Sequence, residues 1–308
     1  MGKARAISLA VAVVVALAAT FVWNASRVGV GVEGCPVGCA STGERKPGAL
    51  RVVSLNVLHG FPDFERLDER LELVAAEIRQ LDADVVCLQE VPWTPEIDGS
   101  GAAFLAKRTG LNHVYFRANG NRSTIRFEEG SAILSRFPLM RAEGHELAPR
   151  AGFFEHRVVL HAAIDTAFGE LDVFSTHLTN GDAEVNRAQA ESLLAFVSRP
   201  RIGPAVVAGD FNARESSPQI ELLSASWIDS FRRAHPDEAG ATCCVDDLAN
   251  ADEVLEKRID YLFVAPGTAD GEGVRIGSSR RILARPAAVG GGWLWPSDHV
   301  GLFSELSF

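Results

Sequence analysis

The chain opens with an apolar segment unlike anything after it. The basic residues Lys3 and Arg5 precede an apolar run over residues 6–23, which one serine and one threonine interrupt. This order is typical of a secretory signal or a signal anchor whose N-terminus stays in the cytoplasm. The run is near the lower length limit for crossing a bilayer, and residues 16–18 (Ala-Leu-Ala) offer a small-x-small cleavage site. We therefore expect residues 1–25 to be a cleaved signal peptide or a retained membrane anchor.

The rest of the chain divides into a short irregular stretch and one long patterned region. Residues 26–49 are rich in glycine and contain proline and charged residues without a hydrophobic period, which predicts a linker. From residue 50 to residue 308 the sequence shows strand and helix patterns without a repeat or a second linker. We expect residues 50–308 to form one domain.

Helical patterns occur at three places in this domain. Apolar residues recur at helical spacing over residues 64–81, after Asp63, which is well placed to cap that helix. A weaker helical pattern covers residues 100–108, and a capped amphipathic pattern covers residues 182–197. These segments predict helices that pack one apolar face against a core.

Strand patterns are more numerous than helical ones. They are short runs rich in β-branched or apolar residues, bounded by glycine, proline and charged residues, over residues 51–56, 84–89, 131–134, 157–164, 171–175, 205–208, 259–264 and 300–306. Helices do not follow every strand. The alternation therefore predicts an α+β fold with more than one sheet rather than a doubly wound parallel sheet.

The overall charge limits the kind of partner. The formal net charge of −10 argues against a protein that holds nucleic acid mainly through a basic surface, because that mode relies on Lys and Arg displacing phosphate counterions. An enzyme that binds a phosphodiester only transiently is compatible with this charge, since a bound metal supplies positive charge locally. No segment indicates an obligate protein partner.

The five cysteines leave several arrangements open. Cys87 lies in an apolar run and is predicted to be a buried thiol. The other four, Cys35, Cys39, Cys243 and Cys244, are sufficient for two disulfides, which fits an exported chain. A zinc site of four thiolates is the alternative, but adjacent cysteines do not match the usual gap between zinc ligands. The sequence does not fix the connectivity.

Polar residues cluster near the ends of the predicted strands, where loops can gather them into one site. They are Asn56, Glu90, His177, Asp210, Asn212, Asp260, Asp298 and His299. Carboxylate and amide oxygens suit Mg²⁺ or Mn²⁺, and histidines suit proton transfer near neutral pH. Phosphoryl chemistry needs this combination, because a metal neutralises the phosphate, a base activates water and donors stabilise the developing charge. Taken singly, each residue is as well explained as a cap or a buried hydrogen-bond partner.

The segments that contain these polar residues occur in an order that resembles a known superfamily. They are Val53-Ser-Leu-Asn-Val57, Asp84-Val-Val-Cys-Leu-Gln-Glu90, Ser175-Thr-His-Leu178, Ala208-Gly-Asp-Phe-Asn212, Arg258-Ile-Asp-Tyr261 and Trp295-Pro-Ser-Asp-His299. This set resembles the endonuclease/exonuclease/phosphatase superfamily, which includes DNase I, neutral sphingomyelinases and inositol polyphosphate 5-phosphatases. The resemblance covers residues 50–308. It implies a catalytic domain with the DNase I-like four-layered α/β sandwich, in which two mostly antiparallel sheets pack face to face with helices outside.

The resemblance also implies a metal site. Glu90 corresponds to the principal ligand of Mg²⁺, with Mn²⁺ as a possible substitute, and Asn56 and Asp298 complete or support the site. Arg157 lies where family members often have a basic residue, so it is a candidate substrate contact. Its position equally suits a surface strand residue.

The remaining residues are implied to act on protons and phosphate oxygens. Asp260 and His299 resemble a paired acid and imidazole, in which the carboxylate orients the ring and favours its charged form. Asp210 is implied to orient or deprotonate the attacking water or to assist the leaving group. Asn212 and His177 are implied to donate to phosphate oxygens. Which group acts as the formal base is left open.

The sequence predicts an exported, metal-dependent hydrolase of phosphate esters that acts on nucleic acid or on phospholipid headgroups. Leu58 replaces the aspartate that repair nucleases place two residues after the first-motif asparagine, which counts against an abasic-site endonuclease. The absence of a long basic element counts against an inositol 5-phosphatase. The alternative is a catalytically silent binding module anchored to the cell envelope. The intact set of polar residues argues against that alternative.

Overall fold

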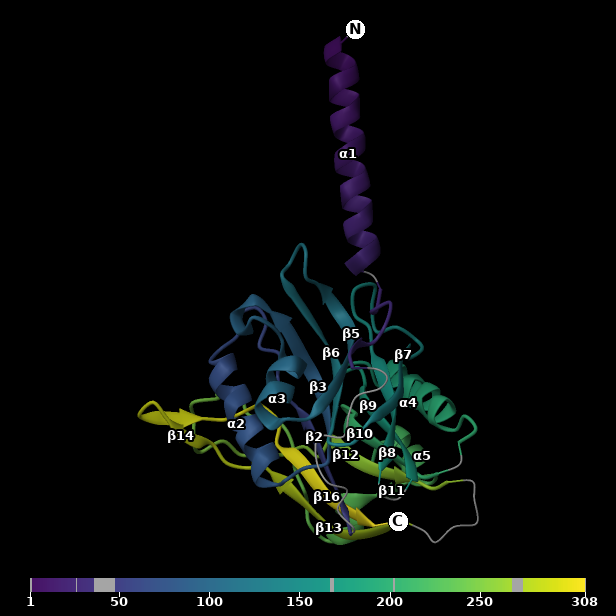
Figure 1. Cartoon of the computed structure of the whole chain (residues 1–308), viewed down its shortest axis with the longest axis vertical. Helices are drawn as coiled ribbons and strands as arrows, with labels where there is room; N and C mark the ends of the chain where they lie inside the picture. The colour runs from purple at the N-terminus through teal and green to yellow at the C-terminus, as the bar shows by residue number, and fades with distance from the viewer. Residues whose placement is uncertain are drawn as a thin grey trace.

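The computed structural model describes residues 2–25, 27–35, 48–166, 169–201, 203–267 and 274–307. The first helix, α1 (Gly2–Ala25), projects away from the rest of the chain (Figure 1). Its window Ile7–Asn24 is long and apolar enough to cross a membrane, a property that it shares with signal sequences. Within the predicted linker, Glu33 and Gly34 form strand β1, and residues 36–47 lie outside the described residues.

The larger sheet has eight strands in the order β1-β5-β6-β3-β2-β16-β13, with β4 paired to β3. The strands β2 and β3 are parallel, and every other neighbouring pair in this sheet is antiparallel. The bounds are β1 (Glu33–Gly34), β2 (Leu50–Asn56), β3 (Val85–Thr94), β4 (Gly99–Ser100), β5 (Asn112–Asn121), β6 (Phe127–Ser135), β13 (Arg275–Ile282) and β16 (Gly301–Ser307).

The smaller sheet has six strands in the order β11-β12-β10-β9-β8-β7. Here β9 and β10 form the parallel pair, and the other neighbours are antiparallel. The bounds are β7 (Leu139–Glu146), β8 (Val158–Thr166), β9 (Gly169–His177), β10 (Ala205–Asp210), β11 (Ile228–Asp229) and β12 (Asp260–Ala265). A separate hairpin joins β14 (Ala287–Val289) to β15 (Gly292–Leu294).

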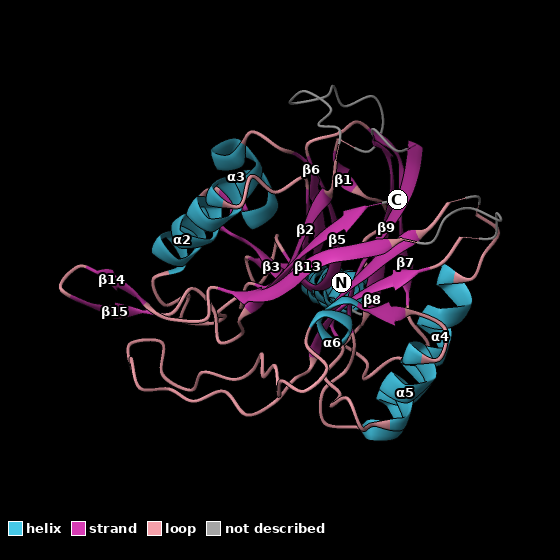
Figure 2. Ribbon diagram, turned by 90° about the horizontal axis from the view of Figure 1, so that it is seen from below, coloured by secondary structure: helices cyan, strands magenta, loops and turns pink. Residues whose placement is uncertain are grey.

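Four layers result from the burial of both faces of each sheet. Along β2, Leu50 and Val52 pack between the sheets, whereas Val53 and Leu55 pack against the outer helices, as the two-residue period of a strand requires. Figure 2 shows α2 and α3 on one side of the sheets and α4 and α5 on the other. The helices are α2 (Leu67–Gln80), α3 (Gly101–Thr109), α4 (Ala183–Val197), α5 (Pro218–Ser224), the short α6 (Ser230–Ala234) and the 3₁₀ turn η1 (Pro95–Ile97). The predicted α+β sandwich of two packed sheets is confirmed.

The start of α2 corrects one sequence prediction. The helix begins at Leu67, and its N-cap is Arg66, so the predicted cap Asp63 is wrong. Phe64 and Arg66 both have left-handed backbone, with φ of 51° and 45°, and a helix cannot continue through such residues. By contrast, Asp182 caps α4 as predicted, because its side chain accepts hydrogen bonds from two N–H groups of the first turn.

The strands that sequence analysis missed lie outside the centres of the sheets. β7 and β13 are the last strands of their sheets, and most of their residues are exposed or half-buried. They carry no continuous apolar run, because only one face of such a strand packs against the core. β5 lies next to the two-residue edge strand β1, and polar residues interrupt its pattern.

Candidate active site

The two parallel strand pairs bring the candidate residues to one edge of the sandwich. Asn56 ends β2 and Glu90 lies in β3, whereas His177 and Asp210 end β9 and β10. Parallel neighbours present their carboxyl ends at the same edge of a sheet. In the smaller sheet, Asp210 pairs in register with His177 on one side and with Asp260 on the other.

Local backbone geometry determines the direction of several of these side chains. Glu90 has φ of 52° and lies where the pairing of β3 with β6 shifts register, between Leu88 and Val91. Such a bulge re-aims a side chain that regular pleating would direct elsewhere. Asn212 also has left-handed backbone, with φ of 50°. A Cβ atom on Gly209 would lie 2.0 Å from the Thr176 carbonyl oxygen, so the residue before Asp210 must be glycine for β9 and β10 to pair.

The candidate residues surround one pocket of about 370 Å³. Its walls include the predicted residues Glu90, Arg157, His177, Asp210, Asn212, Asp298 and His299. The two other predicted residues, Asn56 and Asp260, are buried and contact wall residues from behind. The structure thus gathers every residue that the sequence singled out, from both sheets and from the loop before β16.

His299 lies between two carboxylates. Its Nδ1 is 2.9 Å from Asp260 Oδ2, and its Nε2 is 3.7 Å from Asp210 Oδ2. Burial alone would lower the pKa of His299, but the charges of Asp260 and Asp210 outweigh burial and raise it well above its ordinary value. Burial and the neighbouring Asp260 charge raise the pKa of Asp210 to about 7. The imidazole therefore favours its charged form, and Asp210 titrates near neutral pH.

A second imidazole is held in the opposite state. Asn212 Nδ2 is 2.9 Å from His177 Nε2, and Arg157 Nη1 is 3.1 Å from His177 Nδ1. Burial, followed by the charges of Arg157 and His299, lowers the pKa of His177 well below its ordinary value. The Asn212 backbone N–H donates to Asp210 Oδ1 at 2.8 Å. A neutral His177 thus lies beside the donors Arg157 and Asn212, and its Nε2 is 3.4 Å from Asp210 Oδ2.

The third part of the site contains candidate oxygen ligands for a metal. Asn56 Nδ2 donates both to Glu90 Oε1 and to Asp210 Oδ2, at 3.1 Å each, so one amide connects the two sheets. The His59 backbone N–H donates to Glu90 Oε2 at 3.3 Å. Burial raises the pKa of Asp298, and the charge of Glu90 raises it further. Two carboxylates that repel each other in one pocket fit a divalent cation between them.

The geometry offers another place for a metal. Among the described residues, ligand atoms of Asp210, Asp260 and His299 lie within 4.8 Å of one another. Glu90 and Asp298, the ligands implied by the resemblance, belong to no such group. The imidazole of the tight group is already bonded to Asp260, and a hard cation such as Mg²⁺ prefers oxygen ligands. The donor chemistry therefore fits Mg²⁺ better at Glu90 and Asp298 than at His299.

Arg70 supports the oxygen ligands and was missed in the sequence. Its guanidinium is fully buried and donates to the carbonyls of Val57 (2.9 Å), Leu58 (3.0 Å) and Pro296 (3.2 Å). Burial lowers its pKa to about 10, and the charge of Asp298 opposes that shift. The signal was available, because Arg70 lies at helical spacing from Leu67 on an apolar face.

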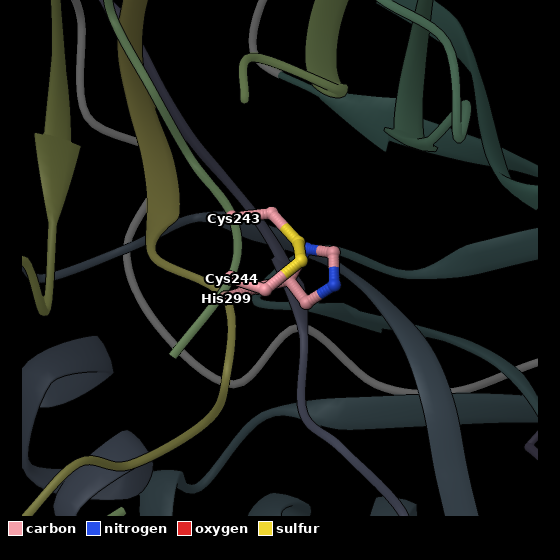
Figure 3. Close-up of side chains that lie close together, drawn as sticks. All are labelled: Cys243, Cys244 and His299. Carbon is pink, nitrogen blue, oxygen red and sulfur yellow. A yellow bond between two sulfur atoms is a disulfide. The ribbon is translucent and has the colours of Figure 1, made fainter. Parts of the chain in front are cut away.

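The pocket rim adds residues that no motif predicted. Arg214 and Lys257 contribute positive charge, and Cys243 and Cys244 lie beside His299 (Figure 3). These adjacent cysteines form a disulfide with each other. In this disulfide state they are not available as thiolates, so the four-thiolate zinc alternative does not hold. Cys87 is a buried free thiol, as predicted.

Comparison with known proteins identifies the family. The model of the Endonuclease/Exonuclease/phosphatase family matches residues 53–299. YbhP, an uncharacterized protein of Escherichia coli K12, is 30% identical over 200 residues, which cover 61% of this chain and 76% of YbhP. An inositol phosphosphingolipids phospholipase C of Schizosaccharomyces pombe is 22% identical over 289 residues, which cover 78% of this chain and 64% of that protein.

Solved structures share the fold. A family protein from Leptotrichia buccalis gives a TM-score of 0.65 at 17% identity and covers 84% of this chain and 100% of its own. TDP2 of D. rerio, complexed with a single-strand DNA product, gives a TM-score of 0.67 at 18% identity and covers 85% of this chain and 100% of its own. The chain belongs to the endonuclease/exonuclease/phosphatase family, whose members are phosphoric ester hydrolases.

Proposed function

We propose that the chain is a Mg²⁺-dependent phosphodiesterase whose active site is this pocket. One observation carries the proposal: His299 lies between Asp260 and Asp210, and Asn56 bonds both Asp210 and the metal-ligand candidate Glu90. A structural histidine does not require a second carboxylate on its free side. Hydrolysis of a phosphodiester needs a base and stabilisation of the developing charge, and this cluster offers groups for both beside candidate oxygen ligands.

Each residue has a role that follows from its surroundings. Asp210, with a pKa of about 7, can accept the proton of a water molecule near neutral pH. His299 is held charged by Asp260, so it stabilises the negative charge that develops on the phosphate. The Asn212 amide bonds His177 and the Leu178 carbonyl, and it would exchange one of these bonds for a phosphate oxygen. Neutral His177 would donate through its single N–H without adding a proton-transfer step. Arg157 extends this set of donors with a fixed positive charge.

The metal completes the charge balance. Glu90 and Asp298 would hold it, with Mn²⁺ as a substitute for Mg²⁺, and Asn56 would support Glu90 by donating from its amide nitrogen. When bound, it neutralises phosphate charge and lowers the pKa of an attacking water molecule. Arg70 keeps these ligands in place by holding the backbone on either side of them.

A phospholipid headgroup is the favoured substrate, and nucleic acid is the second candidate. Phe153 and Phe154 are 60% and 54% exposed in the loop that leads to Arg157 of the pocket. Exposed adjacent aromatic side chains are typical of surfaces that enter a lipid interface. α1, which we propose to be an export signal or membrane anchor, contacts the body where Arg117 Nη1 donates to Asn24 Oδ1 at 3.2 Å.

A substrate panel tests the activity. The full chain in detergent is assayed with sphingomyelin, phosphoinositides, DNA, RNA and bis-p-nitrophenyl phosphate, with Mg²⁺ and with EDTA. The Asp210→Ala/His299→Ala double variant serves as the control for contaminating hydrolases. The proposal expects EDTA-sensitive hydrolysis of at least one diester that the double variant lacks. A folded chain that binds Mg²⁺ and hydrolyses no member of the panel would instead support the silent binding module.

A further inference from the structure

The Cys243–Cys244 disulfide lies in the wall of the active-site pocket, beside the imidazole of His299 (Figure 3). Cys243 is buried, whereas Cys244 is partly exposed toward the pocket. A small reductant that enters the pocket can therefore reach a sulfur atom. The proposed hydrolysis uses neither sulfur.

Backbone contacts of Cys243 and of Val245, on either side of Cys244, hold this segment in place independently of the sulfur–sulfur bond. The Cys243 N–H donates to the Lys257 carbonyl at 2.9 Å, and the Lys257 N–H donates back at 3.0 Å. The Val245 N–H donates to the Asp298 carbonyl at 2.9 Å, and Cys243 forms a β-bridge with His299. None of these bonds involves sulfur. We therefore expect both side chains to stay beside His299 after reduction.

Once the sulfur–sulfur bond is reduced, the three side chains have the chemistry and the proximity of a metal-ligand set. Sulfur atoms of Cys243 and Cys244 and a ring nitrogen of His299 all lie within 4.8 Å of one another. Two thiolates and an imidazole form a soft ligand set of the kind that binds Zn²⁺, with a water molecule in the fourth position. Adjacent cysteines lack the usual gap between zinc ligands, so the proximity of both sulfur atoms to His299, and not the spacing, carries the assignment. His299 also belongs to the group formed with Asp210 and Asp260. A metal bound to one ring nitrogen would make that nitrogen unavailable to the other group.

We propose that Cys243, Cys244 and His299 form a redox-gated zinc site. As a disulfide, the site is closed and His299 stays with Asp260 and Asp210. As a dithiol, the site binds Zn²⁺, which occupies a ring nitrogen of His299 and stops hydrolysis. The zinc site stands on the ligand geometry alone, whereas the inhibition rests on the proposed function.

The chemical steps balance with one co-reactant. A dithiol reductant, of the thioredoxin class or a synthetic equivalent, attacks one sulfur and forms a mixed disulfide. Its second thiol then releases the protein, so two electrons pass to Cys243 and Cys244 and the reductant becomes a disulfide. On zinc binding, the two protein thiols release their protons to solvent and become thiolate ligands. In an oxidising compartment the disulfide persists and the enzyme stays active.

Cobalt binding tests the site without reference to hydrolysis. The full chain in detergent is reduced, freed of reductant under argon and titrated with Co²⁺, which reports thiolate ligands by a near-ultraviolet charge-transfer band. We expect the band in the reduced chain at one equivalent, its absence in the oxidised chain, and its loss when Zn²⁺ is added. A reduced chain without the band would overturn the proposal.

Matched variants assign the band to residues. The Cys243→Ser/Cys244→Ser variant should lack it, and the Cys35→Ser/Cys39→Ser variant should keep it. If the first variant does not fold, iodoacetamide treatment of the reduced Cys35→Ser/Cys39→Ser variant removes the Cys243 and Cys244 thiolates instead. His299→Ala should weaken Co²⁺ binding about tenfold while the band remains, because one of three protein ligands is gone. Unchanged affinity in His299→Ala, or a band that survives in the first variant, would refute this ligand set.

Inhibition is tested on the substrate that the panel identifies, with Mg²⁺ in excess. One equivalent of Zn²⁺ should reduce hydrolysis by at least about tenfold in the reduced chain and leave the oxidised chain unchanged. Each form is compared with its own rate without zinc. Equal inhibition of both forms would show that zinc acts at the magnesium site and would overturn the regulatory part. If no substrate is found, the cobalt result still decides the zinc site.

Discussion

Two buried histidine–aspartate pairs can be compared in this molecule. His299 Nδ1 lies 2.9 Å from Asp260 Oδ2 at the active-site pocket, and His161 Nε2 lies 2.7 Å from Asp172 Oδ1 in the smaller sheet. The contacts within the pairs are nearly the same. The surroundings differ, because the second nitrogen of His299 faces Asp210 and the pocket, whereas the ring of His161 stacks on Phe174 with centroids 4.5 Å apart.

The difference shows what makes a histidine a candidate for catalysis. The second nitrogen of His161 faces Glu143, which is largely exposed, at 3.4 Å, and no residue of the proposed metal site contacts this pair among the described contacts. Hydrogen bonding to a carboxylate orients an imidazole in both places. Only at His299 does a second buried carboxylate, itself bonded to Asn56, lie beside the ring. The predictions below separate these two environments.

The largest expected effect is on the metal. Glu90→Ala should reduce Mg²⁺-stimulated kcat/KM by a factor on the order of 10³, because the principal carboxylate ligand is lost. The measurement is kcat/KM as a function of Mg²⁺ concentration. The matched control is Glu143→Ala beside His161, which should keep both rate and metal response. If wild type and Glu90→Ala respond equally to Mg²⁺, the cation binds at another site and the assignment of Glu90 is wrong.

The next effect is on the support of the metal ligands. Arg70→Met should lower the free energy of unfolding by about 3 kcal/mol, because buried carbonyls of Val57, Leu58 and Pro296 lose their donor. Urea denaturation measures this change. Arg79→Met, on an exposed part of the same helix, should shift stability by no more than about 0.5 kcal/mol. Similar values for the two variants would exclude the supporting role of Arg70.

The pair at His161 should affect stability and not hydrolysis. His161→Ala removes a buried ring from Phe174 and a partner from Asp172, and it should lower the free energy of unfolding by about 2 kcal/mol. Thermal unfolding and kcat/KM are measured on the same preparation. A large fall in kcat/KM with unchanged stability would show that His161 takes part in catalysis. The proposed difference between the His161 and His299 pairs would then be wrong.

The smallest effect is a dependence on pH. Burial raises the pKa of Asp210 to about 7, and the proposed base works only when it is deprotonated. The value of kcat/KM should therefore fall about tenfold for each pH unit below neutrality. The His161→Ala variant should show the same fall of kcat/KM at low pH, because the His161–Asp172 pair lies apart from Asp210. A flat profile down to the ordinary pKa of a carboxyl group would exclude Asp210 as the base.

The sequence predicted the centre of the fold and of the site better than their margins. Central strands such as β2 and β10 are buried on both faces, so they appear in the sequence as apolar runs. The edge strands β7 and β13 are largely exposed and show no such run. Asp210, Asp260 and His299 were found because they lie in ordered motifs. Sequence motifs contain no information on distances, so the position of His299 between two carboxylates could be seen only in the structure.

Other features were hidden for different physical reasons. Asp63 has a residue type that often caps helices, but left-handed backbone at Phe64 and Arg66 delays the start of α2. The place of Arg70 on an apolar helix face indicated burial, but its partners are backbone carbonyls, which side-chain motifs do not reveal. The bond between Cys243 and Cys244 was not predicted, because cysteine pairing cannot be read from spacing.

The most direct test of the account is hydrolysis by His299→Ala and His161→Ala at equal folded concentration, on the same substrate and with saturating Mg²⁺. The account predicts that kcat falls by a factor on the order of 10³ in His299→Ala, because the imidazole between the two carboxylates is lost. It predicts no more than a few-fold change in His161→Ala. Equal rates in the two variants would contradict the claim that the pocket around His299 is the catalytic centre.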